Sequence, residues 1–248
     1  MSKTPQETFD ELLEKAKRDE NIIGFILGAG RGKGFATEHS DYDVIVVVPD
    51  SNLLEYKKKY EEPYYSTEVI EIHVYSLSEF KQYAVWGSSD DAHRYNFTHL
   101  KAVIDRTGEV QKMIDEKGVL PPDKIKEFVS GELDKYINLY YRSVKNHRDK
   151  NIVASHLDAA ESMCSLLVIV FGIEGRLRPY NKFLEWELVK HPLQLLPWKA
   201  NVFLSKLQTI VTTGDVVTQK ELLYTVFELF RQHGYGKVID GWDGYYMG

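Results

Sequence analysis

The pattern of apolar and polar positions is typical of short strands in the first half of the chain. Residues 22–27 and 44–48 are continuous apolar runs, and the second is rich in β-branched side chains, as in a strand buried on both faces. Residues 69–75 alternate between apolar and polar positions, which favours a strand with one exposed face. A shorter run at residues 102–104 completes a small predicted sheet.

Helices are predicted around these strands. Thr4 and Glu7 have the spacing of a capping box, with a proline at the first helical position, so we expect a helix from residue 4 to residue 18. Ser76 and Glu79 repeat this spacing directly after the third strand. Two weaker helices are predicted at residues 53–60 and 109–116.

The pattern becomes helical after residues 118–122, which contain two prolines and form the predicted linker. Residues 125–144 carry an apolar stripe at helical spacing, and residues 152–171 are apolar nearly all round. Weaker helices are expected at residues 183–190, 199–211 and 219–232. The sequence therefore predicts an α/β domain over residues 1–118 and an all-α helical bundle over residues 122–248.

Composition narrows the class of protein. The chain is 43% hydrophobic and 27% charged, as in soluble globular proteins, and its net charge of −6 lacks the attraction expected of a general nucleic-acid binder. The single cysteine, Cys164, excludes an internal disulfide and fits a reducing cytoplasm. The longest near-apolar run, residues 164–172, is too short to span a bilayer. We expect a cytoplasmic protein without a membrane or nucleic-acid partner; a homodimer is compatible with this composition.

Three carboxylates fall where two predicted strands can bring them together. Asp41 and Asp43 are two residues apart at the entrance of the second strand, so their side chains project to one face. Glu71 is a polar position of the next strand, and His73 shares its face. If the strands pair, like charges crowd together and raise one another's pKa, a cost that a divalent cation removes. Asp41, Asp43 and Glu71 are therefore predicted Mg²⁺ ligands, because Mg²⁺ prefers oxygen donors.

A glycine-rich segment, residues 28–34, follows the first strand. Four glycines in seven residues predict a tight loop, whose backbone N–H groups can bind phosphate oxygens. The predicted nucleotide contacts in and after this loop are Gly28, Ala29, Gly30, Arg31 and Ser40, with Lys33 as an alternative cation. Each of these features alone has an ordinary structural explanation, such as a polar turn or an exposed strand residue. Their order on consecutive elements is what favours a functional site.

Residues 27–48, LGAGRGKGFATEHSDYDVIVVV, resemble the signature of the polymerase-β-like nucleotidyltransferase superfamily. That signature is a Gly-Ser or Gly-Gly turn, a loop, and Asp-x-Asp entering an apolar strand. Residues 102–108, AVIDRTG, resemble the closing strand of the same domain. With a helical half behind it, the chain most resembles the aminoglycoside and lincosamide nucleotidyltransferases. The resemblance implies an α/β nucleotidyltransferase domain with a small mixed sheet, followed by a helical bundle, with Mg²⁺ and a nucleoside triphosphate, ATP first.

The chain departs from this pattern at the turn. The serine whose hydroxyl usually contacts a nucleotide phosphate is replaced by Ala29 or Gly30, depending on how the loop is aligned. Phosphate binding would then depend on backbone N–H groups and on Arg31 or Lys33. Ser40 can replace the missing hydroxyl only if the loop folds back.

The second long helix of the bundle carries polar residues at helical spacing. These are Asp158, Glu161, Ser162 and Ser165, at i, i+3, i+4 and i+7, and they are predicted to form one stripe. The stripe faces either water or a substrate; in the second case Glu161, with Asp158 as the alternative, is the general base, as a helical-domain carboxylate can be in the resembling branch. Arg178 and Lys182, in a basic loop similar to one in relatives, are predicted to contact the triphosphate.

The resulting hypothesis is an enzyme that transfers a nucleoside monophosphate from a nucleoside triphosphate to a hydroxyl of a small acceptor. An aminoglycoside-like compound is a candidate acceptor, which would make the protein an antibiotic-resistance enzyme. Two alternatives stay open: an antitoxin-like enzyme that adenylylates a partner protein, and a non-catalytic nucleotide-binding module, which the missing serine suggests.

Overall fold

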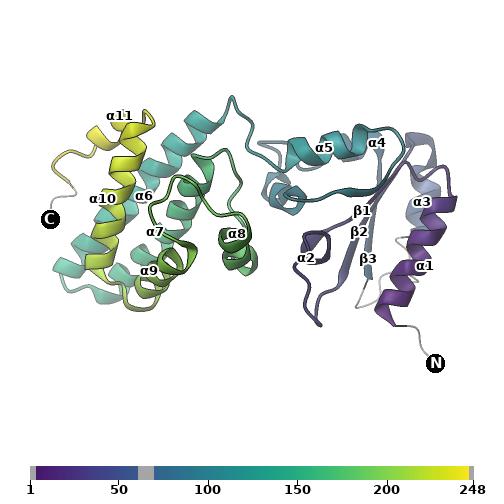
Figure 1. Ribbon diagram of the computed structural model, residues 1–248. Helices are drawn as coiled ribbons and strands as arrows, with labels where there is room; N and C mark the ends of the chain where they lie inside the picture. Colours follow the sequence, from purple (N-terminus) through teal and green to yellow (C-terminus); the bar gives the residue numbers. More distant parts are fainter. Residues whose placement is uncertain (1–3, 61–69, 246–248) are drawn as a thin grey trace. The chain divides into compact units, whose positions relative to one another are not determined.

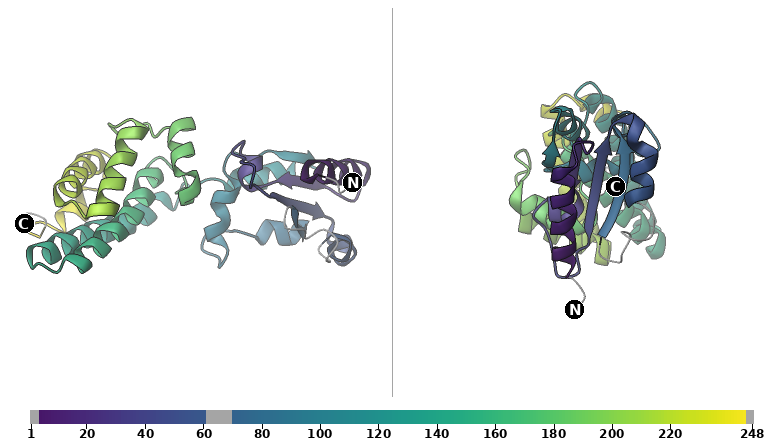
Figure 2. Two further views of the ribbon diagram at one scale, coloured as in Figure 1. Left: turned by 90° about the horizontal axis from the view of Figure 1, so that it is seen from below. Right: turned by 90° about the vertical axis from the view of Figure 1, so that its right-hand side faces the viewer.

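The computed structural model describes residues 4–60 and 70–245 of the chain. The chain divides into two compact units, Met1–Val119 and Leu120–Gly248. Figure 1 labels their elements, and Figure 2 shows each unit from two further directions. Unit 1 consists of α1 (Pro5–Arg18), β1 (Gly24–Leu27), α2 (Ala29–Gly32), β2 (Tyr42–Val48), the 3₁₀ turn η1 (Asp50–Asn52), α3 (Leu53–Tyr60), β3 (Ile70–Ser76), α4 (Leu77–Gln82), η2 (Asp91–Phe97), β4 (Ala102–Asp105) and α5 (Glu109–Lys117).

The four strands of unit 1 form a small mixed sheet with the order β3-β2-β1-β4. β1 is antiparallel to both β2 and β4, whereas β2 and β3 are parallel. The predicted strands and the predicted mixed sheet are confirmed within the described residues; Val69, the first residue of the predicted third strand, lies outside them. Because β2 and β3 are parallel, both strands begin at the same end of the sheet, which decides whether the carboxylates predicted there can meet.

Helices α1 and α3 cover one face of the sheet. Phe9 and Leu12 of α1 and Tyr56 of α3 pack in one apolar cluster with Val44 of β2 and Ile72 of β3. All of these side chains are nearly inaccessible to water. Their burial explains the period-2 alternation of β3, since its apolar positions face these helices and its polar positions face away.

The opposite face of the sheet is covered only in part. Val47 of β2 packs in a second apolar cluster with Phe80 of α4, Phe97 of η2 and Val110 of α5. Toward the entrances of the two strands, however, the same face carries polar side chains, and Glu71 and His73 of β3 are exposed there. The sheet therefore has one closed face and one face with an open, polar part.

The capping boxes predicted from the sequence are both present. The Thr4 side chain accepts a hydrogen bond from the Glu7 N–H, and the Ser76 side chain accepts one from Glu79, with the reciprocal bonds formed in each case. These boxes fix where α1 and α4 begin, because they satisfy N–H groups that have no partner inside a helix.

The glycine-rich segment is not wholly a loop, so the prediction of a tight loop is wrong for four residues. It contains the single turn α2, which Ala29 enters with a φ of 41° and Gly34 follows with a φ of 73°. Gly32 permits this turn, since a Cβ there would overlap the carbonyl oxygen of Leu27 and press on Leu100. The single helical turn thus begins with one residue of positive φ, Ala29, and is followed by another, Gly34.

Buried cations hold the irregular parts of unit 1. The amine of Lys33 donates to the carbonyl oxygens of Tyr95 and Thr98, and to the Thr98 hydroxyl at 2.8 Å. The Arg94 guanidinium donates to the carbonyl oxygens of Ala84 at 3.1 Å, and of Glu116 and Val119 at 2.7 Å each. These oxygens belong to η2 and to the segments that follow α4, η2 and α5, or to the last turn of α5, so the two cations tie these irregular segments together. Lys33 is therefore committed to the interior and is not placed to bind a phosphate.

Unit 2 is all helical. It consists of α6 (Ile125–Arg148), α7 (Ile152–Gly172), the 3₁₀ turn η3 (Asn181–Phe183), α8 (Leu184–Lys190), α9 (Ala200–Thr213), α10 (Val216–Gln232) and α11 (Gly236–Asp240). The five helices predicted from the sequence are confirmed; α11 is an addition that its short apolar pattern did not predict. An α/β unit with a small mixed sheet, followed by a helical unit, is the fold class that the sequence predicted.

The core of unit 2 lies between α6, α7 and α10. Leu133 and Tyr136 of α6 pack with Leu166 and Ile169 of α7 and with Phe230 of α10. Within the described residues, α7 is the one helix long and apolar enough to cross a membrane by length and composition, and half of that stretch is buried inside the protein. This burial is typical of the central helix of a bundle.

Candidate functional site

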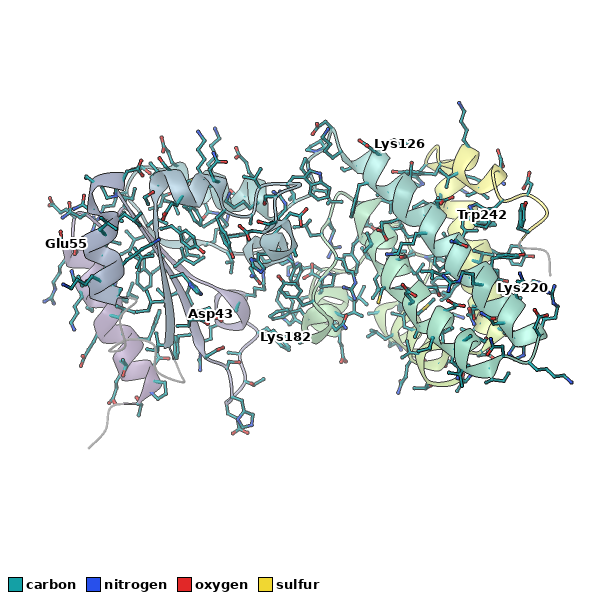
Figure 3. All side chains as sticks on the ribbon, turned by 180° about the vertical axis from the view of Figure 1, so that it is seen from behind. Asp43, Glu55, Lys126, Lys182, Lys220 and Trp242 are labelled. Carbon is teal, nitrogen blue, oxygen red and sulfur yellow. The ribbon has the colours of Figure 1, made fainter. Side chains whose placement is uncertain are left out.

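The entrances of β2 and β3 bring two of the predicted carboxylates side by side. Asp43 of β2 is the register partner of Glu71 of β3 in the parallel pair. Register partners in neighbouring strands point to the same face, about 4.8 Å apart. Asp43 is partly exposed and the Glu71 side chain is 56% exposed, so both are accessible from the open part of the sheet. Figure 3 shows Asp43 on the sheet beside α2.

Asp41 does not join this pair as closely. It lies one residue before β2 and is exposed, so the strand alternation that predicted its direction does not extend to it. Within residues 4–60 and 70–245, no group of three or more His, Cys, Asp or Glu side chains lies close enough to hold a metal ion. The structure thus pairs Asp43 with Glu71 but does not assemble the predicted set of three carboxylates.

Glu71 has a neighbour on its own strand. Its Oε1 lies 3.1 Å from Nε2 of His73, which is also about half exposed. The imidazole is therefore within reach of one carboxylate oxygen and is placed to orient it. Asp43 and Glu71 still fit Mg²⁺, because this ion is commonly bound by one or two carboxylates together with substrate phosphates.

The glycine-rich turn lies directly against Asp43. The Gly28 N–H donates to the Asp43 carbonyl oxygen at 2.7 Å, and a Cβ at Gly28 would lie 3.2 Å from that oxygen. Ala29 follows in the left-handed region, which is uncommon for a residue other than glycine, and Gly30 is buried. Strain of this kind is typical of functional sites. The hydrogen bond from Gly28 thereby holds the turn next to Asp43, one member of the acidic pair.

Arg31 and Ser40 close the loop back onto β2. The Arg31 guanidinium donates to the carbonyl oxygens of Ser40, at 2.7 Å, and of Asp41, at 3.1 Å, and it lies 3.9 Å from the centre of the Tyr42 ring. The Ser40 hydroxyl accepts a hydrogen bond from the Thr37 N–H at 2.9 Å. Both side chains that were predicted to contact phosphate are thus engaged in fixing the loop that presents Asp41.

The predicted polar stripe on α7 is divided by the fold. Asp158 is buried, with Oδ1 2.9 Å from the Arg142 guanidinium and Oδ2 accepting a hydrogen bond from Asn146 at 2.8 Å. Ser162 and Ser165 are buried beside it, and Ser162 donates to a backbone carbonyl of its own helix. Glu161 is exposed. The prediction that these residues share one face is therefore wrong for Glu161.

Nothing in the sequence predicted which residues would be the partners of Asp158. Arg142 and Asn146 are ordinary polar positions near the end of α6, and only the packing of α6 against α7 brings them to the carboxylate. A buried carboxylate with two such partners is a common structural arrangement.

The basic loop after α7 holds its side chains locally. Arg178 donates to the Asn181 side chain at 2.7 Å, and the Lys182 amine lies 4.9 Å from the centre of the Phe183 ring. Lys182 is exposed, and Figure 3 shows it at the surface of its own unit. Both cations are compatible with anion binding, but each already has a neighbour inside unit 2.

Comparison with known proteins finds solved structures with a similar fold. No protein-family model matches the chain, and no curated protein is a significant match. A nucleotidyltransferase-like protein from Exiguobacterium sibiricum 255-15 is a similar solved structure, with 12% identity, a TM-score of 0.44, and 95% of this chain and 78% of that chain covered. An aminoglycoside 6-adenyltransferase from Bacillus subtilis matches with 13% identity, a TM-score of 0.33, and 97% and 91% covered. Both TM-scores are low, so the function proposed below depends on the residues of this chain.

Proposed function

We propose that this chain is a Mg²⁺-dependent nucleotidyltransferase. It would transfer a nucleoside monophosphate from a nucleoside triphosphate, with ATP as the first candidate, to a hydroxyl of a small acceptor. The observation that supports this most is the register pairing of Asp43 with Glu71 on the open part of one sheet face. Two carboxylates held side by side repel each other, and a divalent cation shared with substrate phosphates turns that repulsion into binding.

Asp43 and Glu71 are the residues that would hold the ion, and Asp41, two positions before Asp43 in the chain, is a further proposed ligand. When bound, Mg²⁺ would supply charge neutralisation for the transferred and leaving phosphate oxygens. The chain's own contribution is placement. His73 orients Glu71, Arg31 fixes the backbone that leads to Asp41, and the Gly28 N–H ties the turn to β2.

The turn is the proposed phosphate contact. Because the Gly28 N–H is already bonded to Asp43, the backbone amides of Ala29 and Gly30 are the groups proposed to meet phosphate oxygens. Ala29 has no hydroxyl that could donate a further hydrogen bond to phosphate. Arg31 is proposed to hold the loop in place and not to contact phosphate directly. Weak phosphate binding in the absence of Mg²⁺ is the expected consequence.

Residues of unit 2 have proposed roles as well. Glu161 is the accessible carboxylate of the polar group on α7 and is the proposed general base for the acceptor hydroxyl. Asp158 is less suited, because its oxygens are already held by Arg142 and Asn146. Arg178 and Lys182 remain proposed contacts of the triphosphate. An aminoglycoside-like compound is the first acceptor class to test.

The test is transfer of label from ATP labelled in its α-phosphate to a panel of hydroxyl-bearing acceptors, with and without Mg²⁺. Asp43→Asn and Glu71→Gln should each lower transfer by about 100-fold or more, the scale for a group that acts in the transition state. Glu55→Gln is the matched control, since Glu55 is an exposed glutamate on α3, which covers the opposite face of the sheet (Figure 3).

Other outcomes separate the alternatives. Label that appears on a protein in a cell extract, and on no small acceptor, would favour an enzyme that adenylylates a partner. Calorimetric binding of ATP with no transfer would favour a non-catalytic module, for which the absent serine at Ala29 and the incomplete carboxylate set are specific support. If no label moves, and Asp43→Asn leaves Mg²⁺–ATP affinity unchanged, the proposed site is wrong.

A further inference from the structure

Three ring-bearing side chains lie together beside the open part of the sheet face. Tyr75 follows Glu71 and His73 on the same face of β3, because strand residues two apart share a face. Tyr83, the residue after α4, stacks on Tyr75 with ring centres 5.0 Å apart and 26° between the ring planes. His93 of η2 adds its imidazole, whose Nδ1 lies 2.9 Å from the Tyr83 hydroxyl oxygen. We call Tyr75, Tyr83 and His93 the aromatic rim.

Core packing accounts for only the inner side of the aromatic rim. Tyr75 and Tyr83 pack against the second apolar cluster of unit 1, where the Tyr83 and Phe97 rings meet edge to face at 6.0 Å. Both tyrosine side chains are nevertheless partly exposed, and His93 is exposed. The stack and the contact between Tyr83 and His93 hold these rings in one arrangement at the surface. A ligand that binds them therefore meets groups that are already ordered, which favours binding.

The charged residues of the segments that carry the rim have both signs. Lys81 of α4 is exposed, and Asp90 and Asp91 are partly exposed at the start of η2. Glu79 is held in the capping box of α4, and Arg94 is buried with its donors on backbone carbonyl oxygens. Charge therefore does not select a ligand for the rim, and the rings are the feature that does.

The aromatic rim and the glycine-rich turn lie on opposite sides of the acidic pair. The strand order β3-β2-β1-β4 places β1, which leads into the turn, on one side of β2 and β3 on the other. The Gly28 N–H bonds the Asp43 carbonyl oxygen from the side of β1, whereas Glu71 and Tyr75 belong to β3. A substrate held at Asp43 and Glu71 thus has the turn on one side and the strand that carries the rim on the other.

The proposed reaction gives these two sides different roles. A bond forms between the acceptor oxygen and the α-phosphorus while the bond from that phosphorus to the pyrophosphate oxygen breaks, and the hydroxyl proton passes to the general base. The attacking and leaving oxygens are roughly in line on opposite sides of the phosphorus. If the turn holds the leaving phosphates, the acceptor approaches from the side of β3. The nucleoside leaves the phosphorus across this line, so the rim faces the acceptor and not the base.

The length of β3 indicates how large the acceptor is. Tyr75 is the fourth residue after Glu71 on this strand. A strand rises about 3.3 Å per residue, so the two positions are about 13 Å apart. An acceptor whose hydroxyl reacts beside Glu71 reaches the rim only if it is longer than a single sugar ring.

We propose that the aromatic rim binds a ring of the acceptor that is remote from the reacting hydroxyl. The acceptor is then a hydroxylated compound of at least two linked rings. This inference rests on the function proposed above and narrows its substrate class. The remote ring lies against Tyr83 and His93, since ring faces pack well on aromatic side chains, and Tyr75 holds Tyr83 in place.

The experiment is the labelled-ATP assay with Mg²⁺ and with acceptors in matched pairs, each a multi-ring compound and one of its own rings. Kanamycin, with three linked rings, and 2-deoxystreptamine, its central ring, are the first pair. Tyr83→Ala should raise the KM for the multi-ring acceptor about tenfold or more, and His93→Ala about threefold. The KM for the single ring and the KM for ATP should not change.

A second readout does not depend on turnover. Calorimetric titration of the full chain with the multi-ring acceptor, without ATP, should show the same loss of affinity in Tyr83→Ala. Tyr224→Ala is the matched control, because Tyr224 is a tyrosine of α10 that is 46% exposed and lies in unit 2. It should behave as the wild type does in both measurements.

Three results would overturn the assignment of the rim and leave the proposed function intact. These are an unchanged KM for the multi-ring acceptor in both variants, a higher kcat/KM for the single ring than for the multi-ring compound, or an equal rise in the KM for ATP. The last result would assign the rim to the nucleobase. No transfer to any acceptor would instead remove the proposed function, and this inference with it. If thermal unfolding shows that Tyr83→Ala is not folded, His93→Ala, at an exposed position, decides alone.

Discussion

Glu71 and His73 form a side-chain pair on the open part of β3, with the carboxylate and the imidazole 3.1 Å apart. They are two residues apart on one strand, so the pairing needs no other element. In the proposed site this pair holds the carboxylate that faces Asp43. With Mg²⁺ bound, the imidazole would act on the proposed site through the orientation of Glu71, as groups behind metal ligands commonly do.

The first prediction concerns this pair. His73→Ala should raise the Mg²⁺ concentration needed for half-maximal transfer by about tenfold, the lower end of the range for groups behind a metal ligand. A Mg²⁺ titration of the labelled-ATP assay measures it. His39→Ala, at an exposed histidine in the same unit, is the control and should change nothing. An unchanged or lower Mg²⁺ requirement in His73→Ala would show that the imidazole does not help Glu71.

The second prediction concerns the turn beside Asp43. Gly32→Ala should destabilise unit 1 by about 2 kcal/mol or more, because its Cβ would overlap the Leu27 carbonyl, which is backbone and cannot move aside. Gly131→Ala is the matched control, since nothing lies near a Cβ at this exposed position within α6. There the substitution should stabilise by about 0.5–1 kcal/mol. Urea unfolding of both variants gives the comparison, and equal effects would contradict the geometry of the turn.

The third prediction concerns pH. Burial, with a smaller contribution from the charge of Arg94, lowers the pKa of Lys117 from 10.5 to about 8. Between pH 8 and 10.5 the unfolded chain keeps a proton that the folded chain has released, so this amine makes the free energy of unfolding rise with pH across that window. The rise should be on the order of 3 kcal/mol, because each pKa unit between 8 and 10.5 corresponds to about 1.4 kcal/mol. It is lost again as the pH falls through the folded pKa.

The measurement is the difference in unfolding free energy between the wild type and Lys117→Met at a series of pH values. A difference is needed because burial also raises the pKa of Tyr140, to about 12, which acts in the opposite direction at high pH. Lys112→Met, at an exposed lysine on the same helix, should keep the wild-type profile. A Lys117→Met profile parallel to that of the wild type would show that this amine does not titrate on folding.

The fourth prediction separates the two carboxylates of α7. Asp158→Ala should destabilise unit 2 by about 2–3 kcal/mol, because Asn146 and Arg142 lose a buried acceptor, with Arg142 half exposed and partly compensated by water. Glu161→Gln should leave stability within about 0.5 kcal/mol, as exposed substitutions do, and lower transfer by about 100-fold if Glu161 is the base. Thermal unfolding measures the stability of each variant, and kcat measures its rate of transfer. Full activity of Glu161→Gln would show that Glu161 is not the general base.

Local rules in the sequence determined the elements of this protein. The capping boxes at Thr4 and Ser76 were readable because their partners lie three residues away, and α1 and α4 begin where they indicate. The alternation of β3 was readable for the same reason, since a strand places successive side chains on opposite faces wherever it lies. These are short-range constraints, and the chain carries them without reference to its fold.

Tertiary structure decided which of these residues meet. The pairing of Asp43 with Glu71 depends on a parallel register between strands that are separated by a helix, and a shift of one residue would have turned Glu71 to the closed face. Likewise, Lys33 looked like a free cation in the sequence, yet the carbonyl groups of η2, sixty residues later, enclose it. Neither outcome follows from neighbouring residues.

The polar stripe on α7 shows where the boundary lies. Helical spacing alone put Asp158 and Glu161 within about 60° of each other around the helix, which is close enough to predict one face. The packing of α6 against α7 then buried Asp158 and left Glu161 in water. The sequence determined the angles of these side chains around their own helix. Only long-range packing decided which side of that helix is covered, because it depends on the summed burial of many distant residues.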